Sequence, residues 1–182
     1  MDGVVRQLST REVYRNPWLS LREDEVRRPD GSDGVYSVVD KPDFALVIPA
    51  EAGGFHLVEQ YRYPVGGRFW EFPQGTAAGG AVLPPAELAR AELAEETGLR
   101  AGSLVQLGHL HCAYGMSSQG FDVFLATDLT PGPTAREVTE QDMRQRLVGR
   151  DEFEEMIRTG RITDDSTLAA YALLLMREAG RL

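Results

Sequence analysis

The chain has 182 residues and a mass of 20.1 kDa, with 42% hydrophobic and 26% charged residues, values that fit one globular domain and exclude wholesale disorder. A net charge of −9 argues against a surface for nucleic acid or anionic membrane. No run approaches the roughly 18 to 20 apolar residues of a membrane span, and the single cysteine, Cys112, excludes an intrachain disulfide framework. We therefore expect a cytoplasmic protein without a nucleic-acid or membrane partner.

The first eighty residues have the pattern of strands separated by turns. Apolar residues, either alternating or in an unbroken run, predict strands at residues 18–27, 35–39, 44–49 and 55–63. Pro29-Asp30-Gly31 supplies a turn after the first of these strands. Residues 51–54, Glu-Ala-Gly-Gly, reverse the chain between the last two. The unbroken apolarity of the third strand indicates that it is buried.

A central helix is predicted after this first group of strands. Pro84 and Pro85 mark its start, and Gly98 supplies the C-terminal stop after Thr97. Three later strands are predicted near residues 103–111, 121–127 and 143–148. Strands on both sides of a central helix, with helices at the end of the chain, favour an α+β sandwich over a doubly wound sheet.

Two more helices are predicted at the C-terminal end. The first covers residues 152–158 and has a capping-box-like start in Asp151 and Glu154. The second covers residues 166–179, and its cap candidates are Asp164, Asp165 and Ser166. The apolar residues expected on the core-facing side of this last helix are Leu168, Ala172, Leu175 and Met176.

Three glutamates near the end of the central helix carry the strongest functional signal. Glu92 and Glu96 lie about 40° apart around the helix axis, and Glu95 lies about 60° from Glu92 on its other side. Acidic helix faces are often merely solvated, but here the helix dipole disfavours anions and no Lys or Arg follows one turn later within the helix. Hard cations such as Mg²⁺ prefer clustered carboxylates completed by water and phosphate. Together with the glycine-rich loop before the helix, the glutamates predict a metal–phosphate site.

Residues 92–99, ELAEETGL, resemble the second half of the Nudix box, G-x5-E-x7-R-E-U-x-E-E-x-G-U. VEQYRYPVGG (58–67) and WEFPQG (70–75) look like the strand and pre-box segments of the ADP-ribose pyrophosphatase branch of that superfamily. GRITDDSTLAA (160–170) looks like the final turn and helix of the same branch. The resemblance covers roughly residues 13–178, with the order and spacing of the elements kept.

This resemblance implies a Nudix-type α/β/α sandwich with a mixed central sheet in residues 43–182. It also implies an N-terminal antiparallel strand region in residues 1–42, whose strands (about 10–40) commonly exchange across a homodimer in this branch. The activity implied is metal-dependent hydrolysis of ADP-ribose, or a related nucleoside diphosphate sugar, to a nucleoside monophosphate and a sugar phosphate. The cofactor implied is Mg²⁺, for which Mn²⁺ can substitute.

The resemblance also assigns the metal ligands. Glu92 and Glu96 match the leading ligands and are the catalytic glutamates, with Glu95 in support. The backbone carbonyl of Gln74 is expected as a further ligand, because the residue before the box glycine has that role in this branch. Metal held in this way orients the diphosphate and activates the attacking water.

Three residues are expected to bind substrate. Arg62 matches the family position that reaches the substrate phosphates, although an ion pair on the strand surface is the other interpretation. Trp18 stands where some members stack an aromatic ring on the base, and a packing tryptophan at a dimer interface is equally compatible. Glu71 either contacts the ligand or stabilises the loop.

The general base of this branch usually comes from a glutamate on a late loop, here within residues 136–144. The register places Gln141 at that position, and glutamine cannot accept the proton. The neighbouring Glu140 is therefore our choice, with Glu137 and Asp142 as the remaining candidates.

The chain departs from the box at specific positions. Two extra residues separate Gly75 from Glu92, Leu83 stands at the loop glutamate position, and Ala91 replaces the box arginine. These departures favour an alternative, a catalytically impaired Nudix-fold module that binds a nucleotide sugar for regulation. An acidic interaction domain without a small ligand is a third interpretation, but it leaves the glycine-rich loop and Arg62 unexplained.

Overall fold

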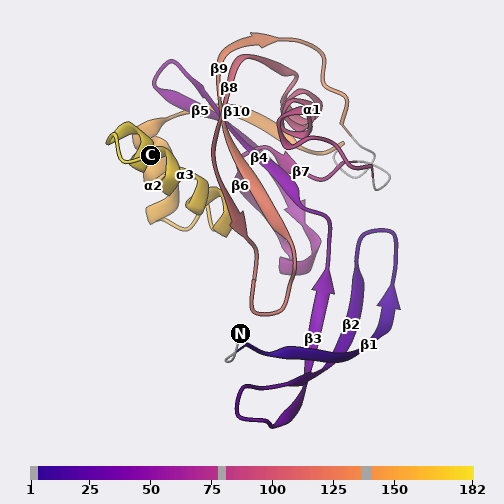
Figure 1. Cartoon of the computed structure of the whole chain (residues 1–182). Helices are drawn as coiled ribbons and strands as arrows, with labels where there is room; N and C mark the ends of the chain where they lie inside the picture. The colour runs from indigo at the N-terminus through magenta and orange to yellow at the C-terminus, as the bar shows by residue number, and fades with distance from the viewer. Residues whose placement is uncertain (1–3, 78–80, 137–140) are drawn as a thin grey trace.

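The computed structural model describes residues 4–77, 81–136 and 141–182. Within these ranges, a large sheet and a smaller N-terminal sheet are combined with helices at both faces of the large sheet (Figure 1). The N-terminal sheet consists of β1 (Arg6–Arg15), β2 (Ser20–Arg27) and β3 (Asp33–Asp40). The large sheet consists of β4 (Phe44–Glu51), β5 (Gly54–Arg62), β6 (Gly67–Glu71), β7 (Gln74–Gly75), β8 (Leu99–His111), β9 (Gly120–Pro131) and β10 (Arg144–Gly149). The helices are α1 (Pro85–Thr97), α2 (Arg150–Arg158) and α3 (Asp165–Glu178), and a 3₁₀ turn, η1, covers Tyr63–Val65.

The large sheet is mixed. Its strand order is β10-β5-β4-β9-β8, with β6 paired to β5 and β7 paired to β4. Strands β4 and β9 run parallel, and the other pairs are antiparallel. Because β7 pairs with β4, the segment just before the glycine-rich loop is held beside a central strand of the sheet.

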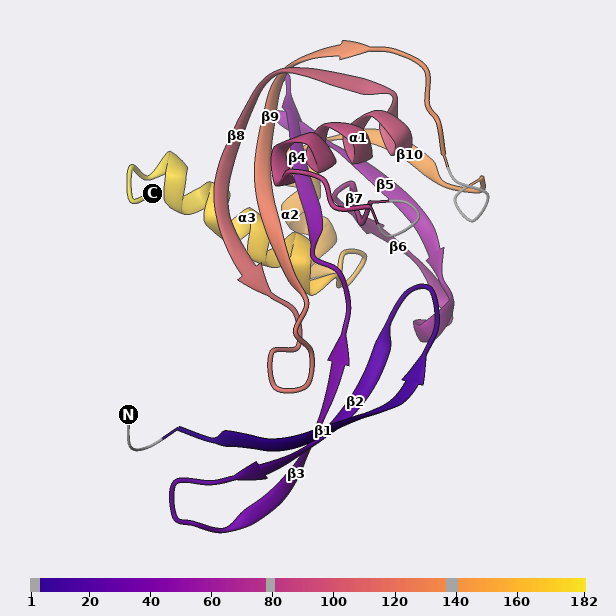
Figure 2. The ribbon, with the colours of Figure 1, turned by 45° about the vertical axis from the view of Figure 1, so that its right-hand side comes forward.

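Strand β4 is buried on both faces of this sheet. Ala45 and Val47 pack under α1, whereas Leu46 and Ile48 pack against the layer formed by α2 and α3. All four are fully buried, which accounts for the unbroken apolar sequence and confirms the predicted buried strand. The two views of the ribbon show the resulting three layers (Figure 2), and the predicted α+β sandwich is confirmed.

Helix α1 follows the sequence prediction closely. It begins at Pro85 and ends at Thr97, and Gly98 adopts the left-handed conformation (φ 73°) that closes the last turn. Ala89 and Leu93, on the side of the helix that faces the sheet, are fully buried. The helix therefore has a fixed rotation about its axis, and this rotation decides where its glutamates point.

The second helix, α2, begins earlier than predicted. Its first residue is Arg150, and its N-cap is Gly149, without any side-chain cap. The predicted capping role of Asp151 is therefore wrong: Asp151 lies inside the first turn, where its charge still complements the positive end of the helix dipole.

The final helix has its predicted cap but not its predicted inner face. Asp164 is the N-cap and accepts a hydrogen bond from the Thr167 amide at 2.8 Å. The residues that α3 buries are Ser166, Thr167, Ala170, Tyr171 and Leu174. The predicted face is wrong for Ala172, Leu175 and Met176, which are exposed, whereas Leu168 is partly buried and packs against the core. Apolar residues surround this helix on most sides, so periodicity could not fix its rotation; the contacts of its first turn do so.

Most strand predictions are confirmed with shifted ends. Gly31 (φ 85°) closes the turn after β2, and β4 and β5 are joined by a tight turn through Ala52 and Gly53, which also have positive φ. Strand β8 starts at Leu99, four residues before the predicted start near residue 103. Strand β1, whose sequence is RQLSTREVYR, lies entirely outside the predicted strand ranges. Every residue in it is exposed, so its apolar residues form no buried face that a pattern could reveal.

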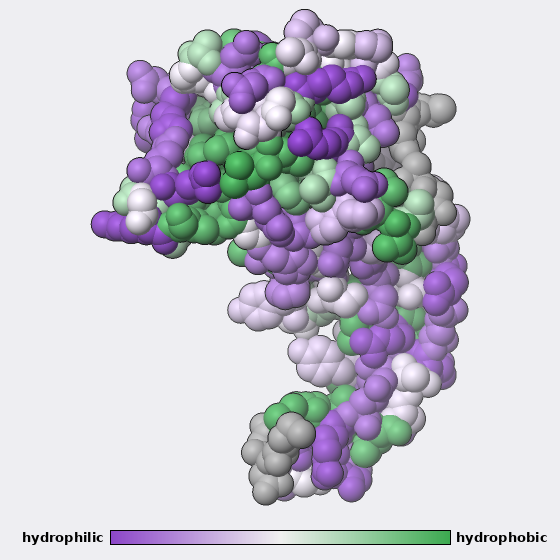
Figure 3. Space-filling model, turned by 45° about the horizontal axis from the view of Figure 1, so that its top comes forward, coloured by the Kyte–Doolittle hydropathy of each residue, from purple (hydrophilic) through white to green (hydrophobic). Residues whose placement is uncertain are grey.

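The N-terminal sheet is a single layer that stands apart from the body in both ribbon views. It is joined to the β8–β9 connection by backbone hydrogen bonds from Val39 to Met116 (2.8 Å) and from Ser118 to Val39 (3.1 Å). The residues on this sheet and its turns that expose large apolar side chains are Leu8, Val13, Tyr14, Trp18, Val35 and Tyr36. Apolar patches are visible on this part of the surface in Figure 3. In the part of the chain that the structure describes, no helix is long and apolar enough to cross a membrane.

Candidate active site

The site forms where β7 meets the last two turns of α1. The Gln74 amide donates to the Glu96 carboxylate (3.2 Å). Glu96 is 1% exposed and Glu92 is 7% exposed, so both predicted catalytic glutamates are removed from bulk water. The Glu92 carboxylate lies so close to Gly75 that a β-carbon at that position would overlap it. A side chain at position 75 would therefore displace the Glu92 carboxylate that packs on this glycine.

The close approach of Gly75 and Glu92 gives a testable prediction. In the variant Gly75→Ala, the new methyl group should displace the flexible end of Glu92 and weaken Mn²⁺ binding about tenfold, with little change in melting temperature. Paramagnetic resonance of free Mn²⁺ measures the affinity. Gly149→Ala is the matched control, because no atom lies within 4 Å of a β-carbon added there. Equal affinities of the two variants would show that the position of Glu92 does not matter.

The donor set suits a hard divalent cation. Within the described ranges, no three side chains of His, Cys, Asp and Glu already stand close enough together to hold an ion. Glu92 and Glu96 nevertheless place two carboxylates one helical turn apart beside a backbone segment, and Glu95 lies partly buried on the same helix. Like charges at this spacing repel unless a proton or a cation lies between them. The residues therefore fit Mg²⁺ or Mn²⁺, with the open positions left for water and phosphate.

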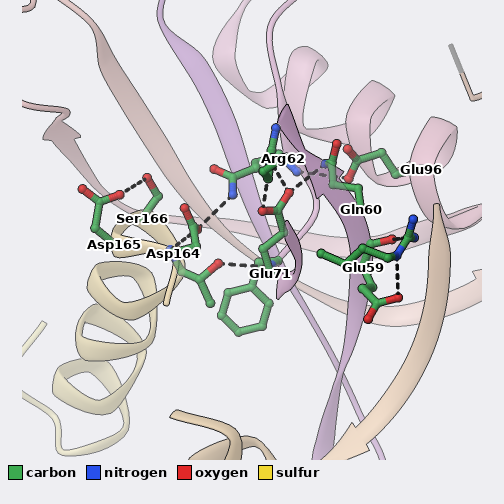
Figure 4. Close-up of polar contacts among 12 residues, drawn as sticks. Glu59, Gln60, Arg62, Glu71, Glu96, Asp164, Asp165 and Ser166 are labelled. Atoms are coloured by element: carbon green, nitrogen blue, oxygen red, sulfur yellow. Dashed lines mark hydrogen bonds and ion pairs between the residues drawn. The ribbon is translucent and has the colours of Figure 1, made fainter. Parts of the chain in front are cut away.

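Arg62 lies near Glu96 and is held by a buried partner (Figure 4). The Arg62 guanidinium donates to both oxygens of the Glu71 carboxylate, one of them at 3.1 Å, and Gln60 donates to the same carboxylate at 2.7 Å. Burial raises the pKa of Glu71, although the Arg62 charge acts in the opposite direction. Glu71 is only 1% exposed, which leaves little of its surface for a ligand, and its substrate contact stays a prediction. The contact that the structure shows, which neither predicted role named, is the ion pair that holds Arg62, whose side chain stays 40% exposed.

Helix α3 is fastened to this site, which sequence reasoning missed. The carboxylate of its N-cap, Asp164, accepts a second hydrogen bond from the Gln74 side chain at 3.0 Å. The Thr167 hydroxyl accepts from the Phe72 amide at 3.0 Å. The sequence marked Asp164 as a cap, but nothing in it signals a partner ninety positions away. The two contacts fix the segment that leads into the box glycine.

The predicted general base, Glu140, lies outside the described residues, as does Glu137. The third candidate, Asp142, forms an ion pair with Arg68 and is exposed to solvent. Gln141 donates to the Arg136 carbonyl at 2.9 Å, within the same loop.

Trp18 lies on the turn between β1 and β2, in the N-terminal sheet. Its amide and that of Leu19 both donate to the Asn16 side chain at 2.9 Å, which defines the turn. The Trp18 side chain is 73% exposed. The structure thus does not bring Trp18 into the cluster of Arg62 and Glu96, but leaves its indole face available for another contact.

Sequence comparisons agree with these features. Residues 5–39 match the family model described as the nucleoside diphosphate sugar hydrolase N-terminal domain. An ADP-ribose pyrophosphatase from Mycobacterium tuberculosis is 36% identical over 123 residues, which is 67% of this chain and 59% of that protein. The match therefore spans less than two thirds of the mycobacterial protein. An ADP-ribose pyrophosphatase from Bacillus subtilis is 24% identical over 176 residues, covering 96% of this chain and 94% of that protein.

The fold has a close counterpart among solved structures. The crystal structure of an ADP compounds hydrolase superposes with a TM-score of 0.83 at 19% sequence identity, covering 98% of this chain and 97% of the other. At that identity the likeness concerns the fold. Combined with the glutamate helix packed on the box glycine and with the two pyrophosphatase relatives, it supports the resemblance of the chain to the ADP-ribose pyrophosphatase branch of the Nudix superfamily.

Proposed function

We propose that the chain is a metal-dependent pyrophosphatase that hydrolyses ADP-ribose, or a related nucleoside diphosphate sugar, to a nucleoside monophosphate and a sugar phosphate. The observation that carries the proposal is the pair of buried glutamates, Glu92 and Glu96, packed against Gln74 and Gly75. The names of the two relatives support ADP-ribose as the first substrate to test.

The residues of the chain have separable roles in this proposal. Mg²⁺ bound at the glutamates would neutralise phosphate charge and lower the pKa of the attacking water. Arg62 presents a partly exposed guanidinium that can bind the diphosphate, and Glu71 keeps it in place from below. Gln74, held by Asp164, brings its backbone to the Glu96 carboxylate. Glu140 stays our predicted general base.

Hydrolysis of ADP-ribose, measured with and without Mg²⁺ beside a panel of nucleoside diphosphate sugars, tests the proposal. Release of AMP that requires the metal would support it and rank the substrates. Silence across the panel, with one nucleotide sugar still raising the melting temperature, would instead support the binding module that Leu83 and Ala91 suggest.

We further propose that the chain is a homodimer whose N-terminal sheets face one another. A single three-stranded layer that exposes side chains such as Tyr14, Val35 and Tyr36 leaves apolar area that a second copy would bury. Light scattering should give a mass near 40 kDa, twice the 20.1 kDa of the chain. A monomer at micromolar concentration would contradict the proposal.

A cytoplasmic location stays a prediction.

Trp18 can be tested as the base-stacking residue by fluorescence. The chain has two tryptophans, so in the variant Trp70→Phe the emission comes from Trp18 alone. Addition of ADP-ribose should quench this emission if the adenine stacks on the indole. Unchanged emission at a concentration that saturates hydrolysis would assign Trp18 to packing instead.

A further inference from the structure

The last turn of α1 presents an electrostatic difficulty. It carries Glu95 and Glu96 but no basic residue, at the end of a helix where the dipole disfavours negative charge. The box positions that could fasten this helix to the preceding loop are occupied by Leu83 and Ala91, and neither can form an ion pair. Contacts from other parts of the chain therefore bear on how this turn and its glutamates are placed.

The segment that follows β9 attaches to this helix end through its backbone carbonyls. The Ala135 amide donates to the Glu95 carbonyl at 3.1 Å, and the Arg136 Nε donates to the Glu96 carbonyl at 3.0 Å. A second nitrogen of the same guanidinium donates to the Met143 carbonyl, just before β10. Two carbonyls at the helix end thus find partners in residues that follow β9. Both carbonyls belong to residues whose side chains are predicted metal ligands.

We propose that Arg136 is a positioning residue for the glutamates of α1. Its positive charge lies at the negative end of the helix. Its planar guanidinium joins the carbonyl of Glu96, at the helix end, to the carbonyl of Met143, just before β10. This inference rests on the proposed function, because it concerns how the metal-binding carboxylates of that function are held. Arg136 itself is not placed in contact with substrate.

The geometry of the last turn indicates how loss of Arg136 would affect the metal-binding carboxylates. The Glu96 side chain meets the Gln74 amide at 3.2 Å, so a small displacement of the helix end separates the carboxylate from the backbone beside it. Misplacing a catalytic group by about 1 Å can cost about a hundredfold in rate. Loss of Arg136 should therefore act on metal binding and turnover more than on substrate binding.

Arg90 offers a matched control on the same helix. Its guanidinium also donates to a backbone carbonyl, that of Ala101, at 2.7 Å, but it is exposed and lies before the glutamates. Arg136→Met and Arg90→Met each remove one arginine that ties α1 to another segment. Only the first removes a contact at the glutamate end.

The test measures Mn²⁺ affinity by paramagnetic resonance, kcat and KM for ADP-ribose, amide hydrogen exchange of residues 93–98, and melting temperature. In Arg136→Met we expect Mn²⁺ affinity to fall about tenfold, kcat to fall about ten- to a hundredfold with KM within about twofold, and exchange to accelerate. Arg136→Lys keeps the charge without the fork and should lie between this variant and the wild type. Arg90→Met should keep wild-type Mn²⁺ affinity and kcat.

Several results would overturn the inference. One is an Arg136→Met variant that folds and keeps the Mn²⁺ affinity and kcat of the wild type. Another is a set of losses that merely follows melting temperature across both methionine variants. If Arg136→Met does not fold, Arg136→Lys decides in the same way. Failure of the proposed function would look different, since the wild type itself would then neither hydrolyse ADP-ribose nor bind Mn²⁺.

Discussion

Glu96→Gln is expected to lower the rate of ADP-ribose hydrolysis by about two to three orders of magnitude while the protein stays folded. The reason is that Glu96 contributes a carboxylate that is 1% exposed, at the point where α1 meets Gln74. Glutamine has nearly the same shape, and its amide oxygen can still accept the Gln74 hydrogen bond. It also removes one of two like charges a helical turn apart, so the melting temperature should hold or rise.

Release of AMP at saturating Mg²⁺, followed beside a thermal melt, checks this expectation. Glu87→Gln is the matched control, because Glu87 is an exposed glutamate in the first turn of the same helix. Activity and melting temperature that fall together in Glu96→Gln would mean that Glu96 is structural. Wild-type activity in this variant would remove the glutamate pair from the mechanism.

Arg62→Met is expected to destabilise the fold by about 2–3 kcal/mol at neutral pH, because it leaves the buried Glu71 carboxylate without its countercharge. The estimate is at the lower end for a broken buried pair because Arg62 is itself partly exposed. Since this guanidinium is also our predicted phosphate contact, KM for ADP-ribose should rise by about tenfold or more.

The loss of stability in Arg62→Met should depend on pH in a fixed direction. Burial already raises the pKa of Glu71, and removing Arg62 takes away the influence that lowers it. The folded chain then gains a proton more readily than the unfolded chain as the pH falls. The penalty should therefore be absent at pH values below the ordinary pKa of glutamate and should grow as the pH rises through the raised pKa.

Urea unfolding at pH 5 and pH 8 measures this difference. The double variant Arg62→Met/Glu71→Gln supplies the control, because it removes the buried charge together with its partner and should recover most of the stability at pH 8. A penalty that is equal at both pH values, or a double variant no more stable than Arg62→Met, would show that the pair acts through packing alone. The KM increase should persist in the double variant.

The sequence predicted the parts of the fold in which local signals agree. The central helix has prolines at its start and a glycine at its end, and β4 has an apolar run that only a strand covered on both faces would carry. The rotation of α3 could not be predicted, because its apolar residues allow several buried faces. The face that α3 buries packs on the core, and its start is held by hydrogen bonds from Gln74 and Phe72, which are distant in sequence.

The same distinction applies to the site. Glu92 and Glu96 were identifiable because their spacing places them on one helix face, and Arg62 was identifiable from the resemblance of its strand. The residues that hold these three side chains in place were not identifiable from the sequence. For Glu71 two roles stayed open, ligand contact or stabilisation of the loop, and its pairing with Arg62 was not predicted because a sequence does not show which way a strand side chain is buried. Arg136 carried no signal because it acts on backbone carbonyls.

The two hydrogen bonds of Asp164 have a consequence for how the protein should lose activity on heating. One carboxylate both starts the C-terminal helix and steadies the approach to the box glycine through Gln74. Fraying of that helix from its first turn would therefore release the site before the sheet comes apart. Irreversible loss of activity is expected to track the melting of the C-terminal helix rather than global unfolding, so that a tag or fusion which strains this end of the chain would shorten the working life of the catalyst.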